Sequence, residues 1–335
     1  MVMDSHSHRG PAQSIAGKLR PGLVWIRRKL LFGVLVSLCW IVWLVPAPFW
    51  HGLVLVAGYA GMLLPTRHVV LENVRQVRGP ASRLSAFQVG SHQIATHIRN
   101  VIGMFRAGAR LPDKTNKLDV EHLDKLAPYL GKRGIVLVAP HAGPYPVMGL
   151  LAARMLKEHG YTGEIAVVAR LFRPIRSGVV REWFIRRYGQ AGVEIVVFDD
   201  GTLRMASRLR SILANNGVVV LLIDEPTDAA SQPVPFFSSA IKLPVGPVRL
   251  SWLTNSVIVP MLTAYRRAGR MSILMEPPIE PQADTEITLN QVASSLERLI
   301  DRELPQWSML SPIWYHGASA PPISGTGDAL PAQSR

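Results

Sequence analysis

Short runs of β-branched residues and leucine recur along the middle of the chain, and each is followed by a segment in which apolar residues have helical spacing. The runs occupy residues 135–138, 164–170, 193–198 and 217–223. The segments after the first three begin near residues 147, 177 and 203. Buried strands that alternate with helices at this spacing predict a mainly parallel sheet covered by helices.

The flanking regions extend the same domain. Residues 69–108 have a basic, helical pattern, which includes His92 and His97, and we interpret these two histidines as surface or packing residues. Residues 111–132 form a polar passage with a short helical pattern. Two later runs, 257–263 and 271–275, are predicted strands, with an antiparallel direction considered for the second, and 287–302 is a predicted helix. The predicted fold class is therefore α/β, with a mixed, mostly parallel sheet flanked by helices over residues 67–316.

The N-terminal region is strongly apolar. The basic cluster Arg27, Arg28 and Lys29 opens an apolar run at residues 30–45, and a second apolar stretch follows at 53–64. A signal peptide is disfavoured because no cleavage site of small residues follows and the run carries tryptophans. A transmembrane helix with its basic end in the cytoplasm and a monotopic hairpin both remain open. A buried core helix fits less well, since the run has no polar stripe. Residues 21–66 are thus a predicted membrane-anchoring segment, and residues 1–20 and 317–335 are predicted disordered tails.

The charge of the chain points to an anionic partner. Lys and Arg number 37 against 23 Asp and Glu, which gives a formal net charge of +14. An acidic lipid surface or an acidic carrier fits this excess, whereas no nucleic-acid-binding, zinc-binding, P-loop or dinucleotide motif is present. The single cysteine, Cys39, excludes an intrachain disulfide and is compatible with a reducing compartment.

Charged side chains follow the predicted strands at the point where each strand ends. His141 comes just after the first strand, Arg170 closes the second, Asp199 and Asp200 follow the third, and Asp224 follows the fourth. The carboxyl ends of parallel strands meet at one edge of a sheet, where ligands bind. A neutral imidazole there can take a proton from a hydroxyl or an amine. Charges also gather at strand ends simply because strand ends are solvated, so both interpretations remain open at this point.

Several sequence blocks, taken in order, resemble a known family. The blocks are HAGPYP (141–146), VVARLFRP (167–174), GVVVLLIDEPTDAASQPVPFF (217–237) and LPVGPVRLSWLTNSVIVPMLTAYRR (243–267), with ENV at 72–74 and PQW at 305–307 as further landmarks. Together they resemble the bacterial lipid A biosynthesis acyltransferases. That family includes lauroyl and myristoyl transferases and phosphatidylinositol mannoside acyltransferases, and it belongs to the lysophospholipid acyltransferase superfamily. The resemblance implies a glycerolphosphate-acyltransferase-like fold.

The resemblance also implies a reaction. A histidine deprotonates an acceptor hydroxyl, which attacks the thioester of an acyl carrier protein or of coenzyme A. His141 matches that base and Asp224 matches the acid of the third block. The predicted substrate-binding residues are Arg170, Arg173, Asp200, Glu225, Arg266 and Arg267, of which Arg170, Arg266 and Arg267 would hold phosphate or carrier. No metal and no cofactor beyond the acyl thioester is implied. The acceptor would be a hydroxyl or amine of a polar lipid, at the cytoplasmic side of a bacterial inner membrane.

Two departures from the family pattern change this picture. The family carries Asp or Glu at the position that Pro146 occupies here, and proline can neither accept a hydrogen bond from imidazole nor balance its charge. Asp200, Asp224 or Glu225 could replace that acid, His141 could act without one, or the protein could be a lapsed relative that binds lipid without acylating it. The late LSPIWYHG (310–317) replaces a basic pattern of the lipid A enzymes, which weakens the expectation of a lipid A acceptor.

Overall fold

The computed structural model describes residues 33, 37, 47–79, 83–109, 118–169, 178–198, 202–225 and 230–315. The chain divides into two compact units, residues 1–52 and 53–335. The described residues of the first unit are Gly33, Ser37 and the start of a helix at Ala47, and most of the predicted run 30–45 lies outside the described residues. The site and its supporting elements all belong to the second unit.

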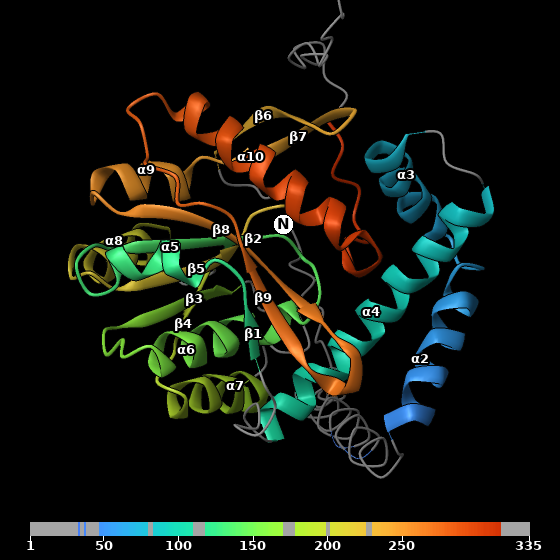
Figure 1. Cartoon of the computed structure of the whole chain (residues 1–335). Helices are drawn as coiled ribbons and strands as arrows, with labels where there is room; N and C mark the ends of the chain where they lie inside the picture. The colour runs from blue at the N-terminus through green and yellow to red at the C-terminus, as the bar shows by residue number, and fades with distance from the viewer. Residues whose placement is uncertain are drawn as a thin grey trace, which may run out of the picture. The chain divides into compact units, whose positions relative to one another are not determined.

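A mixed, mostly parallel sheet is the framework of the second unit (Figure 1). In the described part of the chain it has seven strands in the order β1-β9-β8-β2-β5-β3-β4. Only the pairing of β8 with β9 is antiparallel among these neighbours. The strands are β1 (Leu118–Val120), β2 (Ile135–Ala139), β3 (Ile165–Ala169), β4 (Glu194–Val197), β5 (Val218–Leu222), β8 (Val257–Tyr265) and β9 (Met271–Met275).

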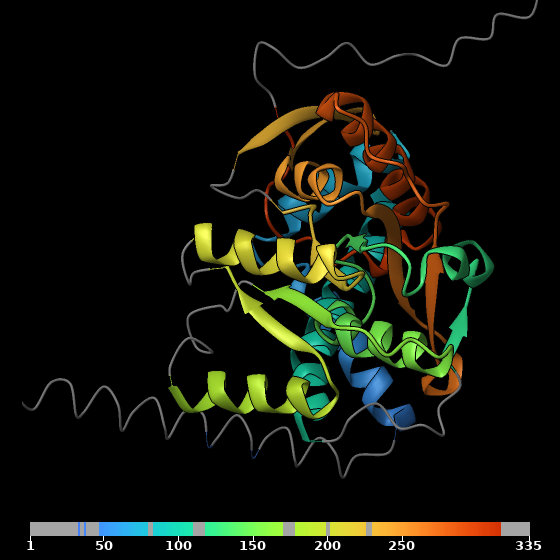
Figure 2. The ribbon, with the colours of Figure 1, turned by 90° about the vertical axis from the view of Figure 1, so that its left-hand side faces the viewer.

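Helices cover both faces of the sheet. Figure 1 and Figure 2 show α6 (Met148–Glu158) and α7 (Gly178–Gln190) below the strands, in green, and α8 (Thr202–Ala214) above them, in yellow. The orange helices α9 (Gly246–Leu253) and α10 (Thr285–Arg302) lie on the same face as α8. The predicted α/β fold with a mixed, mostly parallel sheet flanked by helices is confirmed.

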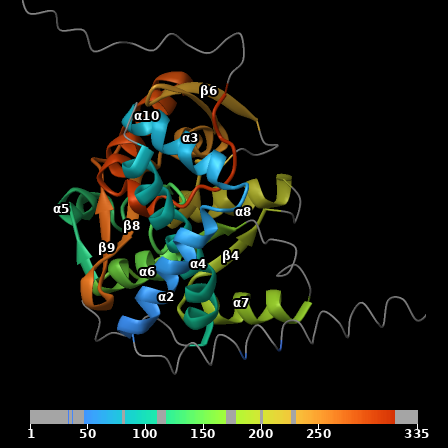
Figure 3. The same cartoon turned by 90° about the vertical axis from the view of Figure 1, so that its right-hand side faces the viewer.

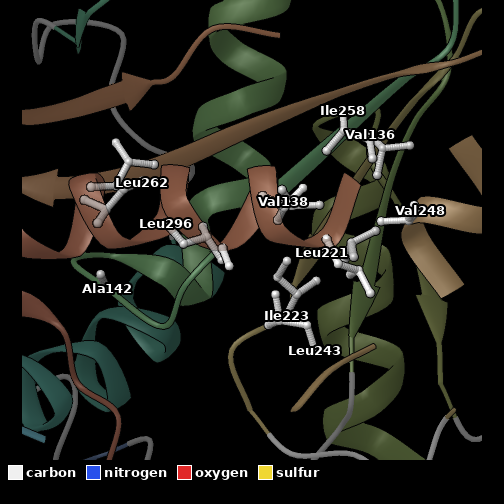
Figure 4. Packing of buried hydrophobic residues seen from close by; sticks show 14 of the residues in the cluster. Val136, Val138, Ala142, Leu221, Ile223, Leu243, Val248, Ile258, Leu262 and Leu296 are labelled. Atoms are coloured by element: carbon white, nitrogen blue, oxygen red, sulfur yellow. The ribbon is translucent and has the colours of Figure 1, made fainter. Parts of the chain in front are cut away.

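Alternation along the strands builds the core. Val136 and Val138 of β2 belong to the buried cluster that includes Val248 of α9 and Leu296 of α10 (Figure 4). All five residues of β2 are buried, so the strand has an apolar layer on each side. This burial explains why β2 is a continuous apolar run rather than an alternating one.

Three N-terminal helices pack together: α2 (Ala47–Gly61), α3 (Arg67–Arg78) and α4 (Arg83–Ala109). Figure 3 shows α2, in blue, running beside α4, in teal. Gly58 allows this close approach, because a Cβ atom there would lie 2.3 Å from the carbonyl oxygen of Ser91. None of the helices in the described residues combines the length and the apolar character needed to cross a membrane.

Several elements depart from the sequence-based expectations. Residues 231–244 form an antiparallel hairpin of β6 (Ser231–Phe236) and β7 (Ser239–Pro244), although Pro233 and Pro235 argue against a strand there. The ribbon tolerates these prolines because both lie in β6, whose other edge pairs with no strand among the described residues. The polar passage before β2 contains β1 as well as the short helix α5 (Leu123–Leu126) and a 3₁₀ turn, Ala127–Tyr129.

Candidate active site

His141 lies on the turn that follows β2, at the carboxyl edge of the sheet. Its backbone carbonyl oxygen accepts hydrogen bonds from the backbone N–H of Ser308 at 2.9 Å and from the Ser308 hydroxyl at 3.1 Å. Its side chain is 17% exposed, so the imidazole is largely enclosed but still reaches solvent. The chain near residue 308 therefore fixes the backbone from which the imidazole projects.

Gly143 gives this turn its shape. Its φ angle of +54° lies in the left-handed region, and a Cβ atom there would lie 1.8 Å from the carbonyl oxygen of Thr263. Its N–H donates to the backbone oxygen of Gln306 at 3.0 Å, and its carbonyl accepts from the Asn100 side chain at 2.7 Å. The turn is thus tied to β8, to the segment before residue 307 and to α4.

Asp224, directly beyond β5, holds the imidazole. Its Oδ1 lies 2.6 Å from Nδ1 of His141, and its Oδ2 accepts the backbone N–H of His141 at 2.9 Å. The indole Nε1 of Trp307 donates to the same Oδ2, also at 2.9 Å. The Asp224 side chain is fully buried. An ionised carboxylate on Nδ1 keeps the proton of a neutral imidazole on that nitrogen, so the lone pair of Nε2 is free to accept a proton.

The other side of the imidazole faces Glu225 and Tyr145. The Oε2 of Glu225 lies 3.8 Å from Nε2 of His141, and the Glu225 side chain is 43% exposed. The Tyr145 ring packs edge-on against the imidazole, with 4.9 Å between ring centroids. Burial raises the pKa of Tyr145 to about 12, and Glu225 and Asp224 add to this rise, so the phenol stays protonated at neutral pH.

The charges around His141 favour its protonated form. Burial alone would lower the pKa of His141, but the charge of Asp224, its hydrogen bond to Nδ1 and the charge of Glu225 outweigh burial and raise this pKa above 6.5. The imidazole therefore gains basicity from the two carboxylates. A base of this kind can accept a proton from a substrate and return it to a leaving group.

Pro146 lies in the 3₁₀ turn Tyr145–Val147, and its carbonyl oxygen accepts a hydrogen bond from the Tyr188 hydroxyl. The acid that the family carries at this position is absent. Of the two candidate replacements that the structure describes, Asp224 hydrogen-bonds Nδ1 of His141, whereas Glu225 lies on the Nε2 side. The carboxylate thus comes from the end of a neighbouring strand instead of from the turn that carries the histidine.

The structure locates only some of the predicted substrate-binding residues. Arg170, Arg173 and Asp200 lie outside the described residues. Arg266, which follows β8, pairs with Glu303 at 2.7 Å, so its charge is already balanced by a carboxylate. Arg267 is exposed and begins the 3₁₀ turn Arg267–Gly269. The described residues contain no group of three or more His, Cys, Asp or Glu side chains that could hold a metal ion.

Sequence reasoning missed the part that Trp307 plays. PQW at 305–307 was noticeable only as a family landmark, and nothing in its pattern indicates that the indole supports a carboxylate 83 residues earlier. The structure also places His97 of α4 close enough to His141 that the charge of one affects the pKa of the other. A helical pattern could not reveal this proximity, because it does not say what the helix packs against.

The fold and the site place this chain among α/β proteins in which a histidine at the end of a central strand is backed by a buried carboxylate. A family model described as "Bacterial lipid A biosynthesis acyltransferase" matches residues 25–316. The chain belongs to this family of acyltransferases.

Two curated relatives are similar to part of the chain. Both are phosphatidylinositol mannoside acyltransferases of Mycobacterium tuberculosis, from strains ATCC 25618 / H37Rv and CDC 1551 / Oshkosh. Each is 24% identical over 196 residues, which is 58% of this chain. The match likewise spans 58% of the length of each relative.

Proposed function

We propose that this protein transfers a fatty acyl group from an acyl thioester to a hydroxyl or amine of a polar lipid, with His141 as the general base. The observation that carries this proposal is the 2.6 Å contact between Nδ1 of His141 and the buried carboxylate of Asp224. It supplies the oriented, basic imidazole that the reaction needs, although the usual acid after the histidine is replaced by Pro146. Membership of an acyltransferase family supports the same conclusion.

In the proposed reaction, Nε2 of His141 takes the proton of the acceptor hydroxyl while its oxygen attacks the carbonyl carbon of the thioester. The carbon–oxygen bond forms and a tetrahedral intermediate collapses with cleavage of the carbon–sulfur bond. The imidazolium then returns the proton to the departing thiolate. Asp224 stabilises the imidazolium between these two transfers. No oxidant, reductant or metal enters this balance.

The donor is an acyl carrier protein or coenzyme A thioester, and the acceptor is a polar lipid. The names of the two relatives support a mannosylated phosphatidylinositol as one acceptor of this kind. The basic excess of the chain, +14, suits both a phosphate-bearing donor and an anionic lipid surface. The residues proposed to contact these substrates are Arg170, Arg173, Asp200, Glu225, Arg266 and Arg267. Of these, Glu225 has its Oε2 at 3.8 Å from Nε2 of His141.

An apolar surface supports association with a membrane. One side of α2 and the turn after it expose Leu53, Val56, Leu63 and Leu64, which are between 56% and 76% accessible. The chain contains no Asp or Glu between residues 5 and 71, so no carboxylate of that region opposes approach to anionic lipid. We place the protein on the cytoplasmic side of the bacterial inner membrane.

The alternative, a lapsed relative that only binds lipid, is less favoured. It was suggested by the loss of the acid at Pro146. Asp224 can replace that acid, because its Oδ1 hydrogen-bonds the His141 imidazole and its Oδ2 accepts a hydrogen bond from Trp307.

The test is mass spectrometry of the lipids from cells that carry an empty vector, the wild-type protein or His141→Ala. We expect a lipid heavier by one acyl group in the wild-type cells alone, because without the imidazole no group takes the acceptor proton. Fragment ions of that lipid would identify the acceptor and the acyl chain. Equal amounts of the acylated lipid with wild type and His141→Ala would remove His141 as the base. No acyl difference, with the protein shown in the membrane fraction, would favour the lipid-binding alternative.

A further inference from the structure

A second histidine lies on the helix that packs against the site. Gln93, His97 and Asn100 are spaced by four and three residues, so they share one face of α4. Asn100 donates to the carbonyl oxygen of Gly143 at 2.7 Å, and Gln93 donates to that of Leu304 at 2.9 Å. The first bond reaches the turn that carries His141, and the second reaches the segment that leads to Trp307. His97 therefore lies between two direct anchors of α4 to the site.

The polar side-chain atoms on this face of α4 differ in whether they have a hydrogen-bond partner. Asn100 uses both ends of its amide, since its Oδ1 also accepts the hydroxyl of Tyr265 at 2.8 Å. By contrast, Nδ1 of His97 and Oε1 of Gln93 are buried without a hydrogen-bond partner among the described residues. An unpaired buried polar atom costs about 1–3 kcal/mol, so Nδ1 of His97, which belongs to a partly exposed side chain, is expected to gain a partner when the site is occupied.

Electrostatics shows which kind of partner suits His97. Burial lowers the pKa of His97, and the charge of His141 lowers it further. His97 is therefore neutral at pH 7, with one N–H donor and one lone pair. A neutral imidazole has no charge to attract a phosphate, but it pairs well with a hydroxyl, which both donates and accepts.

The remaining groups of the site favour a hydroxyl over the thioester carbonyl. Nε2 of His141 and the Glu225 carboxylate, which lie 3.8 Å apart, both accept hydrogen bonds and require donors. A thioester carbonyl offers no donor, whereas a polyol headgroup offers several on adjacent carbons. The acceptor groups beside His141 thus match an acyl acceptor with several hydroxyls better than they match the thioester carbonyl.

We propose that His97 is a substrate-binding residue that hydrogen-bonds a second hydroxyl of the acyl acceptor, next to the hydroxyl that His141 deprotonates. This assignment rests on the proposed acyl transfer and adds a specificity determinant to it. It makes the preferred acceptor a headgroup with neighbouring hydroxyls and disfavours a simple alcohol. His97 takes no proton in the reaction and acts by fixing which hydroxyl faces Nε2.

The experiment uses the full chain in detergent micelles with palmitoyl-coenzyme A as donor and two acceptors, octyl glucoside and 1-octanol. The first carries adjacent hydroxyls and the second carries one. His97→Leu removes both ring nitrogens, whereas His97→Asn keeps an amide near the position of Nδ1. Release of free thiol and mass of the acylated product give KM and kcat for each acceptor. Thermal unfolding of both variants is recorded alongside.

For His97→Leu we expect transfer to octyl glucoside to fall about three- to tenfold, mainly through KM, as one neutral hydrogen bond predicts. Transfer to octanol stays at the wild-type rate, and His97→Asn recovers most of the loss. Equal losses of rate on both acceptors would mean that His97 only supports the fold. No loss on either acceptor would mean that water satisfies Nδ1 of His97. Each of these results overturns the assignment of His97 while leaving the proposed acyl transfer intact. Absence of transfer by the wild type to either acceptor would contradict the proposed function, and this assignment with it.

Discussion

At the scale of single residues, Asp224 connects three parts of the site through one buried carboxylate. It orients His141 through Nδ1, accepts the backbone N–H of the same residue and receives the indole of Trp307. Burial of a carboxylate without donors would be unfavourable, so the three bonds explain how the Asp224 side chain can be fully buried. In the proposed reaction its role is confined to orientation and charge, since the atom assigned to the acceptor proton is Nε2 of His141.

The first residue-scale prediction concerns pH. The base form of His141 accepts the proton, and its pKa is raised above 6.5, so kcat/KM should fall on the acidic side of a midpoint that lies above pH 6.5. Asp224→Asn removes the charge that raises this pKa, and burial then lowers it, so the midpoint should move to lower pH. The rate should fall about 10²- to 10⁴-fold, because the tautomer is no longer fixed. A pH–rate profile of purified protein measures both effects.

Glu225→Gln is the matched control for Asp224→Asn. It removes a carboxylate near Nε2 but leaves the Nδ1 contact in place, so the midpoint should move down less and the rate should fall less. If Glu225→Gln abolished activity while Asp224→Asn kept it, the assignment of the orienting acid would be reversed.

At the scale of elements, the turn after β2 depends on parts of the chain that come before it and after it. Ala142 forms an antiparallel bridge with Trp307, and Gly143 contacts both α4 and residue 306. The turn is short and carries no side-chain cap of its own. Neighbouring elements therefore fix the conformation of the turn, and a change in any of them should alter the position of His141.

Gly143→Ala tests this dependence. The substituted residue would adopt a φ of +54° and would bring Cβ to 1.8 Å from the Thr263 oxygen, so the turn must shift. We expect a loss of about 2–4 kcal/mol in the free energy of unfolding, from backbone strain and overpacking together, and loss of most activity. Urea denaturation and the acyl-transfer assay measure the two effects.

Gly131→Ala separates strain from crowding. Gly131 has a φ of +70° but nothing within 4 Å of the Cβ position. The substitution Gly131→Ala should lower the free energy of unfolding by only about 1 kcal/mol and leave the acyl-transfer activity unchanged. Equal stability losses in the two variants would show that the Thr263 contact has no effect.

Particular residues show what sequence could and could not predict. The strands before His141 and Asp224 are apolar runs that local pattern reveals, and the parallel order then brings both side chains to one edge. The β6–β7 hairpin was missed because Pro233 and Pro235 argue against a strand and are tolerated only at the edge of a sheet or ribbon. Trp307 was missed as a site residue because its contacts with Asp224 and with the turn depend on tertiary packing of segments far away in sequence.

At the scale of the whole molecule, the apolar side of α2 remains uncovered in the described structure. Gly58 brings the opposite side of α2 against α4, so the exposed leucines and valine cannot turn inward without separating the two helices. Exposed apolar side chains gathered on one short segment are typical of a place of interaction with a membrane or another protein. We favour the membrane, for the reasons of charge given above.

Replacing Leu53, Val56, Leu63 and Leu64 together by serine tests the membrane surface. We expect binding to vesicles that contain anionic phospholipid to fall at least tenfold in a sedimentation assay, since each apolar side chain contributes about 1.5–3 kcal/mol when fully buried. The serine substitution of the exposed Leu203, on α8, should leave vesicle binding unchanged and serves as control. Unaltered binding of the fourfold variant would assign membrane contact to other residues.

The support that Trp307 and Ser308 give to His141 has a consequence for the order of events during synthesis. A ribosome makes every strand of the sheet, and the histidine itself, before it makes residues 304–309. Until that segment emerges, Asp224 lacks its indole donor and the carbonyl of His141 lacks both donors from Ser308. The nascent chain thus carries all of its apolar N-terminal region well before its base is held in place. Acyl transfer would begin only after residues 304–309 have been made, when the apolar N-terminal region has already had the time of their synthesis to reach the surface where the substrates are.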